Sequence, residues 1–118
     1  MKALVVEDEE GLQLIYKHIL SDAGYDVRLA FDGYVAIKAI EEGLAPDLVI
    51  LDMRMPNCGG LKVLEYLQTY ENIDNMHVVI ASATRDFETY VSMLPSCEFL
   101  LKPVLSPNLL EVVGRVHG

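Results

Sequence analysis

The sequence contains no tryptophan, only two cysteines, and half as many basic residues as acidic ones, nine against eighteen. It also has no stretch near the roughly 20 apolar residues that a membrane-spanning helix needs, so we expect no contact with a membrane. No secretory signal follows Met1-Lys2, which indicates a cytoplasmic protein whose thiols Cys58 and Cys97 stay unpaired. The formal net charge of −9 repels phosphate backbones, and we therefore expect no direct binding of nucleic acid.

What is present fits one folded domain. The chain has 118 residues, of which 52% are hydrophobic and 23% are charged, and a chain of this size can bury a substantial core. No linker, low-complexity tract or internal repeat interrupts it. We therefore predict a single domain over residues 1–118.

The most informative stretch is the apolar run Leu48-Val49-Ile50-Leu51, which ends in Asp52. Four consecutive aliphatic residues without polar alternation predict a strand buried on both faces, and such strands belong to parallel sheets covered by helices. Pro56 and the pair Gly59-Gly60 then favour a loop. Asp52 is thus expected at the carboxyl end of a buried strand, which is the edge where open α/β sheets bind ligands.

The rest of the sequence alternates strand-like and helix-like segments. Strands are predicted at residues 2–6, 26–30, 48–52, 77–81 and 98–101. The second of these alternates polar and apolar residues, which suits a strand at a sheet edge. Because each parallel crossover needs a helix, five strands alternating with five helices predict an α/β fold with a doubly wound, five-stranded parallel sheet.

Each predicted helix carries one apolar stripe, and four of the five also carry a signal for their start or their end. The signals are Gly24, Asp32, Gly43, Pro95, and Ser106 with Pro107. The expected buried positions are, helix by helix, Leu12, Ile15, Tyr16, Ile19 and Ala23; Ala36, Ile37 and Ile40; Val63, Leu64 and Leu67; Phe87, Tyr90, Val91 and Leu94; and Leu109, Val112, Val113 and Val116. The fourth helix is expected to be short because Pro95 follows it.

Polar residues follow four of the predicted strands at one edge of the sheet. They are Glu7 and Asp8, Asp52, Ser82, and Lys102. If the first and third strands are neighbours, three carboxylates meet there. At a separation of about 5 Å and an effective dielectric constant of about 20, each like-charged pair costs roughly 3 kcal/mol. The cluster therefore needs a proton or a cation, and Mg²⁺ is the natural candidate because it binds a few oxygens and keeps several waters.

Taken singly, these residues have ordinary explanations. The run Glu7-Asp8-Glu9-Glu10 is typical of a helix start, where negative charge is favourable. A lone serine or lysine at a strand end usually belongs to a turn or to the surface. The combination of four strand ends with chemically complementary groups nevertheless favours a functional site.

In this order, the motifs resemble those of the receiver domains of two-component response regulators, the family typified by the bacterial chemotaxis response regulator. The resemblance spans the whole chain and rests on Glu7-Asp8, the run from Asp52-Met53-Arg54-Met55-Pro56 to Gly60, Ser82-Ala83, Phe99 and Lys102-Pro103. It implies a flavodoxin-like (βα)5 fold with strand order 2-1-3-4-5. Glu7 stands where an aspartate is commoner in the family.

The resemblance also implies a role for each acidic residue at the sheet edge. Asp52 would accept a phosphoryl group from the histidine of a sensor kinase or phosphotransfer protein. Asp8, Asp52 and the backbone carbonyl of Arg54 would bind Mg²⁺. Glu7 would act on the metal directly or through a water molecule.

Three further residues have implied roles around the phosphoryl group. Lys102 would pair with its oxygens, and the hydroxyl of Ser82 would donate a hydrogen bond to them. Ser82 and Phe99 would then form the switch. This switch would change a protein-interaction surface built from the helix near residues 85–94, the last strand and the last helix.

The resemblance implies a signalling switch and not an enzyme, with at most self-phosphorylation from small phosphodonors and slow autodephosphorylation. Its partners would be a sensor histidine kinase or phosphotransfer protein and a downstream protein target. The chain would be a monomer or a weak phosphorylation-dependent dimer. We also predict a cis Lys102–Pro103 bond, because proline lowers the cost of the cis form to roughly 0.5–1 kcal/mol.

Two other functions stay open. An aspartate-nucleophile phosphohydrolase of the haloacid dehalogenase type also has an aspartate at a strand end. That family needs a second acid two residues later, where this chain has Arg54. The other alternative is a degenerate receiver that binds partners without phosphorylation, and the intact Asp8, Asp52 and Lys102 argue against it.

Overall fold

The computed structural model describes residues 1–53, 59–104 and 106–117. Its strands are β1 (Lys2–Val6), β2 (Asp26–Ala30), β3 (Leu48–Asp52), β4 (His77–Ser82) and β5 (Cys97–Leu101). They form one sheet in the order β2-β1-β3-β4-β5, and every neighbouring pair is parallel. The predicted α/β fold and strand order are confirmed, and β4 and β5 are each one residue longer than expected.

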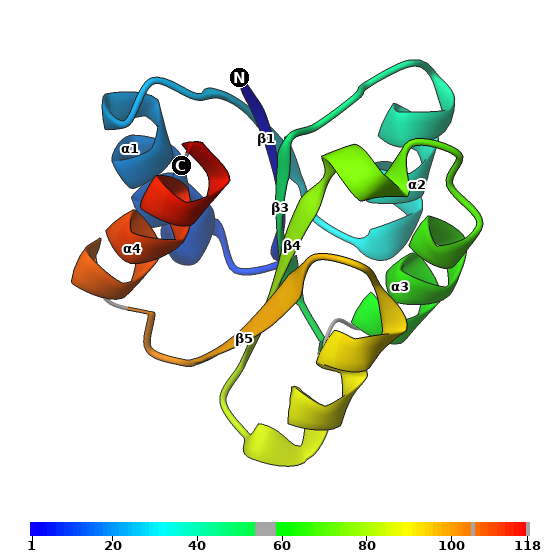
Figure 1. Cartoon of the computed structure of the whole chain (residues 1–118). Helices are drawn as coiled ribbons and strands as arrows, with labels where there is room; N and C mark the ends of the chain where they lie inside the picture. Colours follow the sequence, from blue (N-terminus) through cyan, green and yellow to red (C-terminus); the bar gives the residue numbers. More distant parts are fainter. Residues whose placement is uncertain (54–58, 105, 118) are drawn as a thin grey trace.

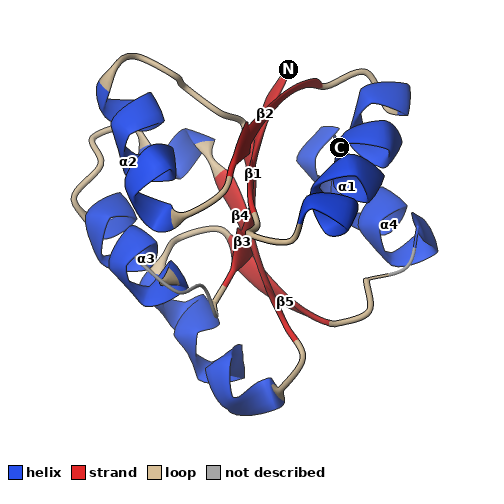
Figure 2. Cartoon of the chain, turned by 180° about the vertical axis from the view of Figure 1, so that it is seen from behind, coloured by secondary structure: helices blue, strands red, loops and turns tan. Residues whose placement is uncertain are grey.

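Helices cover both faces of this sheet. They are α1 (Glu10–Asp22), α2 (Gly33–Glu41), α3 (Gly60–Gln68), α4 (Ser106–His117) and two 3-10 segments, η1 (Ile73–Asn75) and η2 (Arg85–Met93). Figure 1 shows α1 and α4 on one face and α2 and α3 on the other, and Figure 2 shows the same layers from behind. Within the described parts of the chain, no helix has the length and apolar character needed to cross a membrane.

The central strand is buried on both sides, as its sequence predicts. All five residues of β3 are buried. Val49 and Leu51 pack in the cluster formed with α2 and α3, whereas Leu48 and Ile50 pack in the cluster formed with α1 and α4. Since β1 and β3 are neighbours and the chain winds in opposite directions from them, their carboxyl ends lie at the switch point of the sheet, where α/β proteins bind ligands.

Local signals set the ends of the first two helices. The Asp32 carboxylate accepts a hydrogen bond of 2.9 Å from the backbone N–H of Val35 and so caps α2. Gly24 and Gly43 follow α1 and α2 with φ angles of 96° and 109°. This left-handed conformation favours glycine, so the predicted stops are confirmed.

The predicted burial of Ile15 is wrong. Ile15 is 52% exposed, and the buried residues of α1 are Tyr16 and Leu20. The cause is helix geometry, because Tyr16 and Leu20 lie four residues apart on one face and Ile15 is turned about 100° away from Tyr16. In α4, the predicted stripe is confirmed at Leu109 and its neighbours, although the helix already begins at Ser106.

The helix predicted between β4 and β5 exists but has a different winding. Residues 85–93 form a 3-10 helix, and none of them is fully buried. The short connection explains this, because it must run back along a strand of about 17–20 Å. Nine residues span about 13.5 Å as an α-helix but about 18 Å as a 3-10 helix.

A polar network joins the amino ends of β4 and β5 to α4. His77 Nδ1 lies 2.5 Å from Ser96 Oγ, and His77 Nε2 lies 2.5 Å from Glu98 Oε2. Arg115 of α4 donates to both carboxylate oxygens of Glu98. Burial alone would raise the pKa of Glu98, but the hydrogen bonds from Arg115 and His77 outweigh it and lower this pKa.

A cavity of about 220 Å³ opens beside this network. Residues from both ends of the chain line it, including Met1, Arg115 and Val116. It therefore lies at the amino edge of the sheet, opposite the edge where Asp52 emerges. Nearby, Cys97 is a free thiol as predicted, and burial raises its pKa to about 12; Cys58 lies outside the described residues.

Candidate functional site

Three carboxylates meet where β1 and β3 end. One oxygen from each of Glu7, Asp8 and Asp52 lies within 4.8 Å of the others. Glu7 and Asp52 are only 2% and 5% exposed, whereas Asp8 faces solvent. The register pairs Val6 of β1 with Leu51 of β3, so the residues that follow them come together. The predicted convergence of the three acids is therefore confirmed.

Lys102 brings a cation to this cluster from the end of β5. Its Nζ lies 2.9 Å from Glu7 Oε1 and 3.5 Å from Asp52 Oδ1. The backbone N–H of Lys102 donates to the carbonyl of Ser82 at 2.7 Å, which fixes the end of β5 against the end of β4. The Lys102–Pro103 bond is cis, as predicted.

The electrostatics of the site are dominated by burial. Burial raises the pKa of Glu7 by more than the hydrogen bonds from Lys102 and from the backbone N–H of Glu9 lower it, and the charge of Asp52 adds a smaller rise. Burial alone would lower the pKa of Lys102, but the Glu7 hydrogen bond and the Asp52 charge raise it. The pKa of Tyr16 is raised by burial first and then by the charges of Glu7 and Asp52. The site thus combines the neutral phenol of Tyr16 and the charged ammonium group of Lys102 with three carboxyl groups.

Hydrogen bonds hold the loop between β1 and α1 in place. The backbone N–H of Glu7 donates to the carbonyl of Ala30 at 3.0 Å, and Gln13 Nε2 donates to the carbonyl of Glu7 at 2.5 Å. The backbone N–H of Glu9 donates to Glu7 Oε2 at 3.2 Å. Both the main chain and the side chain of Glu7 are therefore fixed before any ligand binds.

Gly60 permits α3 to begin directly against the end of β3. A Cβ atom at this position would lie 2.6 Å from Met53 Sδ and 2.8 Å from both Met53 Cα and the carbonyl oxygen of Asp52. Two of these three atoms belong to the backbone, so a side chain here would displace the segment that carries Asp52.

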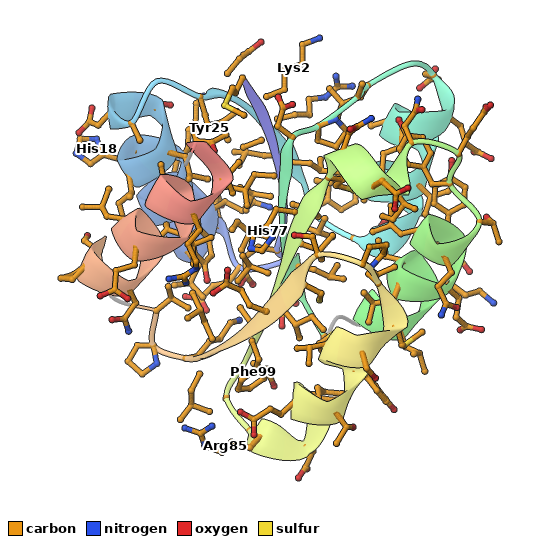
Figure 3. All side chains as sticks on the ribbon, viewed as in Figure 1. Lys2, His18, Tyr25, His77, Arg85 and Phe99 are labelled. Atoms are coloured by element: carbon orange, nitrogen blue, oxygen red, sulfur yellow. The ribbon has the colours of Figure 1, made fainter. Side chains whose placement is uncertain are left out.

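Ser82 and Phe99 lie on the same face of the sheet. Ser82 ends β4 and is 1% exposed, and its Oγ accepts a hydrogen bond of 3.3 Å from the backbone N–H of Thr84. Phe99 is half-buried and pairs in register with Ile80, so it lies in the middle of β5 and not at its end. Figure 3 shows Phe99 beside the start of η2, where Arg85 lies.

The sequence-based reasoning missed two residues that contact or face the site, Gln13 and Tyr16. Tyr16 was expected only as a core residue, and no role was expected for Gln13. The available signal was their spacing, because residues three apart share a helix face, and here that face points at β1 and its acidic end. Of the predicted site residues, Arg54 lies outside the described part of the chain.

The donor set fits a hard divalent cation. Carboxylate oxygens are the ligands that Mg²⁺ prefers, and three of them lie within reach of one ion. Three carboxylates face one lysine here, so the formal negative charge exceeds what Lys102 compensates. A bound cation would relieve that excess.

Comparisons with known proteins agree on one family. The family described as "Response regulator receiver domain" matches residues 3–114. The chain is 32% identical over 118 residues to the alkaline phosphatase synthesis transcriptional regulatory protein PhoP of Bacillus subtilis, with 99% of this chain and 47% of PhoP covered. It is also 30% identical over 118 residues to protein CcdB of B. subtilis, with 99% of this chain and 98% of CcdB covered.

A solved structure with the same fold is the response regulator TrrA from Thermotoga maritima in complex with Mg²⁺-BeF. The two chains superpose with a TM-score of 0.82 at 26% identity, over 98% of this chain and 97% of that one. The chain spans about half the length of several curated relatives, including PhoP.

Proposed function

Because the chain belongs to the family of response regulator receiver domains, we propose that residues 1–118 form a phosphoacceptor switch of a two-component, His-Asp phosphorelay system. In this proposal, Asp52 takes a phosphoryl group from a histidine of a sensor kinase or phosphotransfer protein. The observation that carries the proposal is the position of Asp52. It is buried at the carboxyl end of β3, 3.5 Å from Lys102 Nζ and within 4.8 Å of Glu7 and Asp8.

The transfer forms one bond and breaks another. An oxygen of the Asp52 carboxylate attacks the phosphorus of phosphohistidine, the P–N bond breaks, and its electron pair returns to the imidazole nitrogen. The transition state of such transfers is loose, so alignment and charge stabilisation supply most of the catalysis. Lys102 provides a fixed positive charge next to the attacking oxygen.

We assign Asp8, Asp52 and the backbone carbonyl of Arg54 as ligands of Mg²⁺. When bound, this ion neutralises the acids and the phosphoryl oxygens. Both oxygens of Glu7 already accept hydrogen bonds, one from Lys102 and one from the backbone N–H of Glu9, which favours a contact through water for Glu7. The Mg²⁺-BeF complex of TrrA supports a metal site of this kind.

We further assign Ser82 and Phe99 as the switch. A phosphoryl group brings close to two negative charges and new acceptor oxygens to Asp52. The Ser82 hydroxyl then donates to one of them, and the loop after β4 moves. Phe99 lies on the same face of the sheet as Ser82, two residues before Leu101, the register partner of Ser82. In the proposal, the Phe99 ring turns inward and changes the surface formed by η2, β5 and α4. If the phosphoryl group favours one of the two conformations by roughly 1.4 kcal/mol, the ratio of their populations changes tenfold.

The downstream partner in this proposal is a protein that reads the switched surface. The names of several relatives describe transcriptional regulatory proteins, and this chain covers about half of their length. That this stretch itself contacts no nucleic acid stays a prediction, as does its state as a monomer or weak phosphorylation-dependent dimer. In this proposal, the only reactions that the receiver itself catalyses are self-phosphorylation from small phosphodonors and slow autodephosphorylation.

Intact mass measurement after incubation with acetyl phosphate and Mg²⁺ tests the proposal. The wild type is expected to gain one phosphoryl group, and Asp52→Asn is expected to gain none. Asp26→Asn is the matched control, because it makes the same change at an exposed residue at the start of β2. Phosphorylation of Asp52→Asn would refute the acceptor, and no phosphorylation of the wild type would favour the degenerate receiver.

A further inference from the structure

The winding of η2 is unusual for its length. It runs for nine residues, whereas 3-10 helices longer than three or four residues are uncommon because their hydrogen bonds have poorer geometry. Its side chains contribute no fully buried residue to the core. Phe87, Tyr90, Val91 and Met93 pack against the core but stay partly exposed, so this element is anchored by partial burial together with its ends and its span.

The sequence of η2 satisfies two helical periods. In the 3-10 helix, Phe87, Tyr90 and Met93 recur every third residue, and the rings of Phe87 and Tyr90 have centroids 5.8 Å apart. At the α-helical period, Phe87, Tyr90, Val91 and Leu94 form the stripe instead. Since no proline or glycine lies between residues 85 and 93, either winding is compatible with the residue types.

The start of η2 is connected to the proposed switch through one residue, Thr84. Its backbone N–H donates to Ser82 Oγ at 3.3 Å, which closes a compact serine turn over residues 82–84. Its own Oγ1 accepts a hydrogen bond of 3.3 Å from the backbone N–H of Asp86, in the first turn of η2. The hydroxyl that closes the turn is thus the hydroxyl that a phosphoryl group on Asp52 would attract.

Opening that turn would lengthen the connection at the start of η2. Each residue that rewinds from a 3-10 helix to an α-helix shortens the helix by about 0.5 Å and changes the direction of the next side chain by roughly 20°. A gain of about 1 Å in the loop therefore accommodates the rewinding of roughly two residues. At the other end, Gln68 Nε2 of α3 donates to the carbonyl of Met93 at 3.2 Å and holds the helix in place.

We infer that Thr84 is a positioning residue that couples the acceptor site to η2, and that phosphorylation of Asp52 opens the Ser82–Thr84 turn and rewinds the first turn of η2 from 3-10 to α. Phe87 and Tyr90 change direction as a result, so the partner surface is altered by a change of helix type. The inference rests on the proposed function for its trigger.

The test is NMR on the full chain, with and without Mg²⁺ and beryllofluoride as the phosphoryl mimic. A 3-10 helix gives NOEs from Hα of residue i to the amide of residue i+2, and an α-helix gives them to residue i+4. We expect the ligand to remove the first kind and produce the second kind at residues 85–88. Binding itself is followed separately through the amide shifts around Asp52.

Variants separate the coupling from simple loss of a hydroxyl group. Ser82→Ala removes the acceptor that closes the turn, so its ligand-free spectrum is expected to show the α-type NOEs at residues 85–88. Thr84→Ser keeps both hydrogen bonds and should behave as the wild type. Ser92→Ala is the matched control, because Ser92 is a hydroxyl residue of η2 whose Oγ donates to the carbonyl of Thr89 within the same helix. It should keep the 3-10 pattern without ligand.

The outcomes distinguish the inference from the proposed function. If beryllofluoride binds and residues 85–88 keep the 3-10 pattern, the inference is overturned and the proposed function stands. If beryllofluoride does not bind, the proposed function fails and the trigger fails with it. A 3-10 pattern in ligand-free Ser82→Ala would separately refute the role of the turn.

Discussion

The change Asp52→Asn offers the most direct test of the electrostatics at the acidic cluster. It removes one negative charge and keeps the size of the side chain. We expect the ligand-free protein to become more stable, because Asp52 is repelled by two acids and attracted by one cation. Loss of the acceptor should therefore raise the free energy of unfolding at neutral pH.

The magnitude follows from the distances. At 4.8 Å, the upper limit of these separations, and an effective dielectric constant of about 20, repulsion of Asp52 by Glu7 and by Asp8 costs about 3.5 kcal/mol each. The attraction to Lys102 at 3.5 Å contributes about 4.7 kcal/mol in the same medium. The repulsion wins by about 2 kcal/mol, and solvent screening of the exposed Asp8 reduces the expected gain to about 1 kcal/mol.

Thermal and chemical unfolding in the presence of a chelator measure this gain. About 1 kcal/mol corresponds to a rise of roughly 4 °C in Tm for a domain of this size. At a hundredfold excess over its Kd, Mg²⁺ should stabilise the wild type by about 2.7 kcal/mol, and it should stabilise Asp52→Asn by less. Asp26→Asn, at the other edge of the sheet, should change neither value. Equal Tm values of the wild type with chelator and with Mg²⁺ would refute the reasoning.

Three further changes test other parts of the structure. Gly60→Ala should cost about 2–3 kcal/mol of unfolding free energy, because its Cβ would meet the backbone of Met53 at 2.8 Å, and a loss below 0.5 kcal/mol in urea titration would contradict the close approach. Glu98→Gln should lower the free energy of unfolding at pH 7, because it weakens the contacts with Arg115 and His77. The pKa of Glu98 is lowered from about 4.5 in the folded state, so this contribution is fully present above that pH and is lost as the pH falls through the folded value; a difference that persists at pH 2 would be inconsistent with it. Cys97, with a pKa of about 12, should react with iodoacetamide at pH 8 at least tenfold more slowly than in urea, as judged by peptide mass, and equal rates would show an accessible thiolate.

The fold was predictable because its strongest signals are local. The apolar run of β3 and the glycine stops after α1 and α2 each depend on a few neighbouring residues, and such signals give the succession of strands and helices along the chain. The convergence of Glu7 and Asp52 was predictable for a related reason, since parallel strands end at a common edge. The order 2-1-3-4-5 itself came from the family resemblance.

What the sequence could not show depends on length and on side-chain direction. The stripe Phe87, Tyr90 and Val91 predicted a helix at the right place but with the α-helical period, and the distance that the connection has to span selected the 3-10 form. Similarly, the sequence contains Lys102 and Glu7 without indicating that Lys102 lies closer to Glu7 than to Asp52. Such choices are made by tertiary distances, which periodicity does not contain.

The cavity at the amino edge has a practical consequence for handling this protein. Met1 and Val116 line the same cavity, and Figure 1 shows the start of β1 and the end of α4 on that side of the sheet. An affinity tag, a fluorophore or a surface tether attached at either end therefore points away from Asp52. A short linker between the two ends would likewise permit a circular permutant, whose new ends could be opened at the exposed Gly43 without touching the acidic edge.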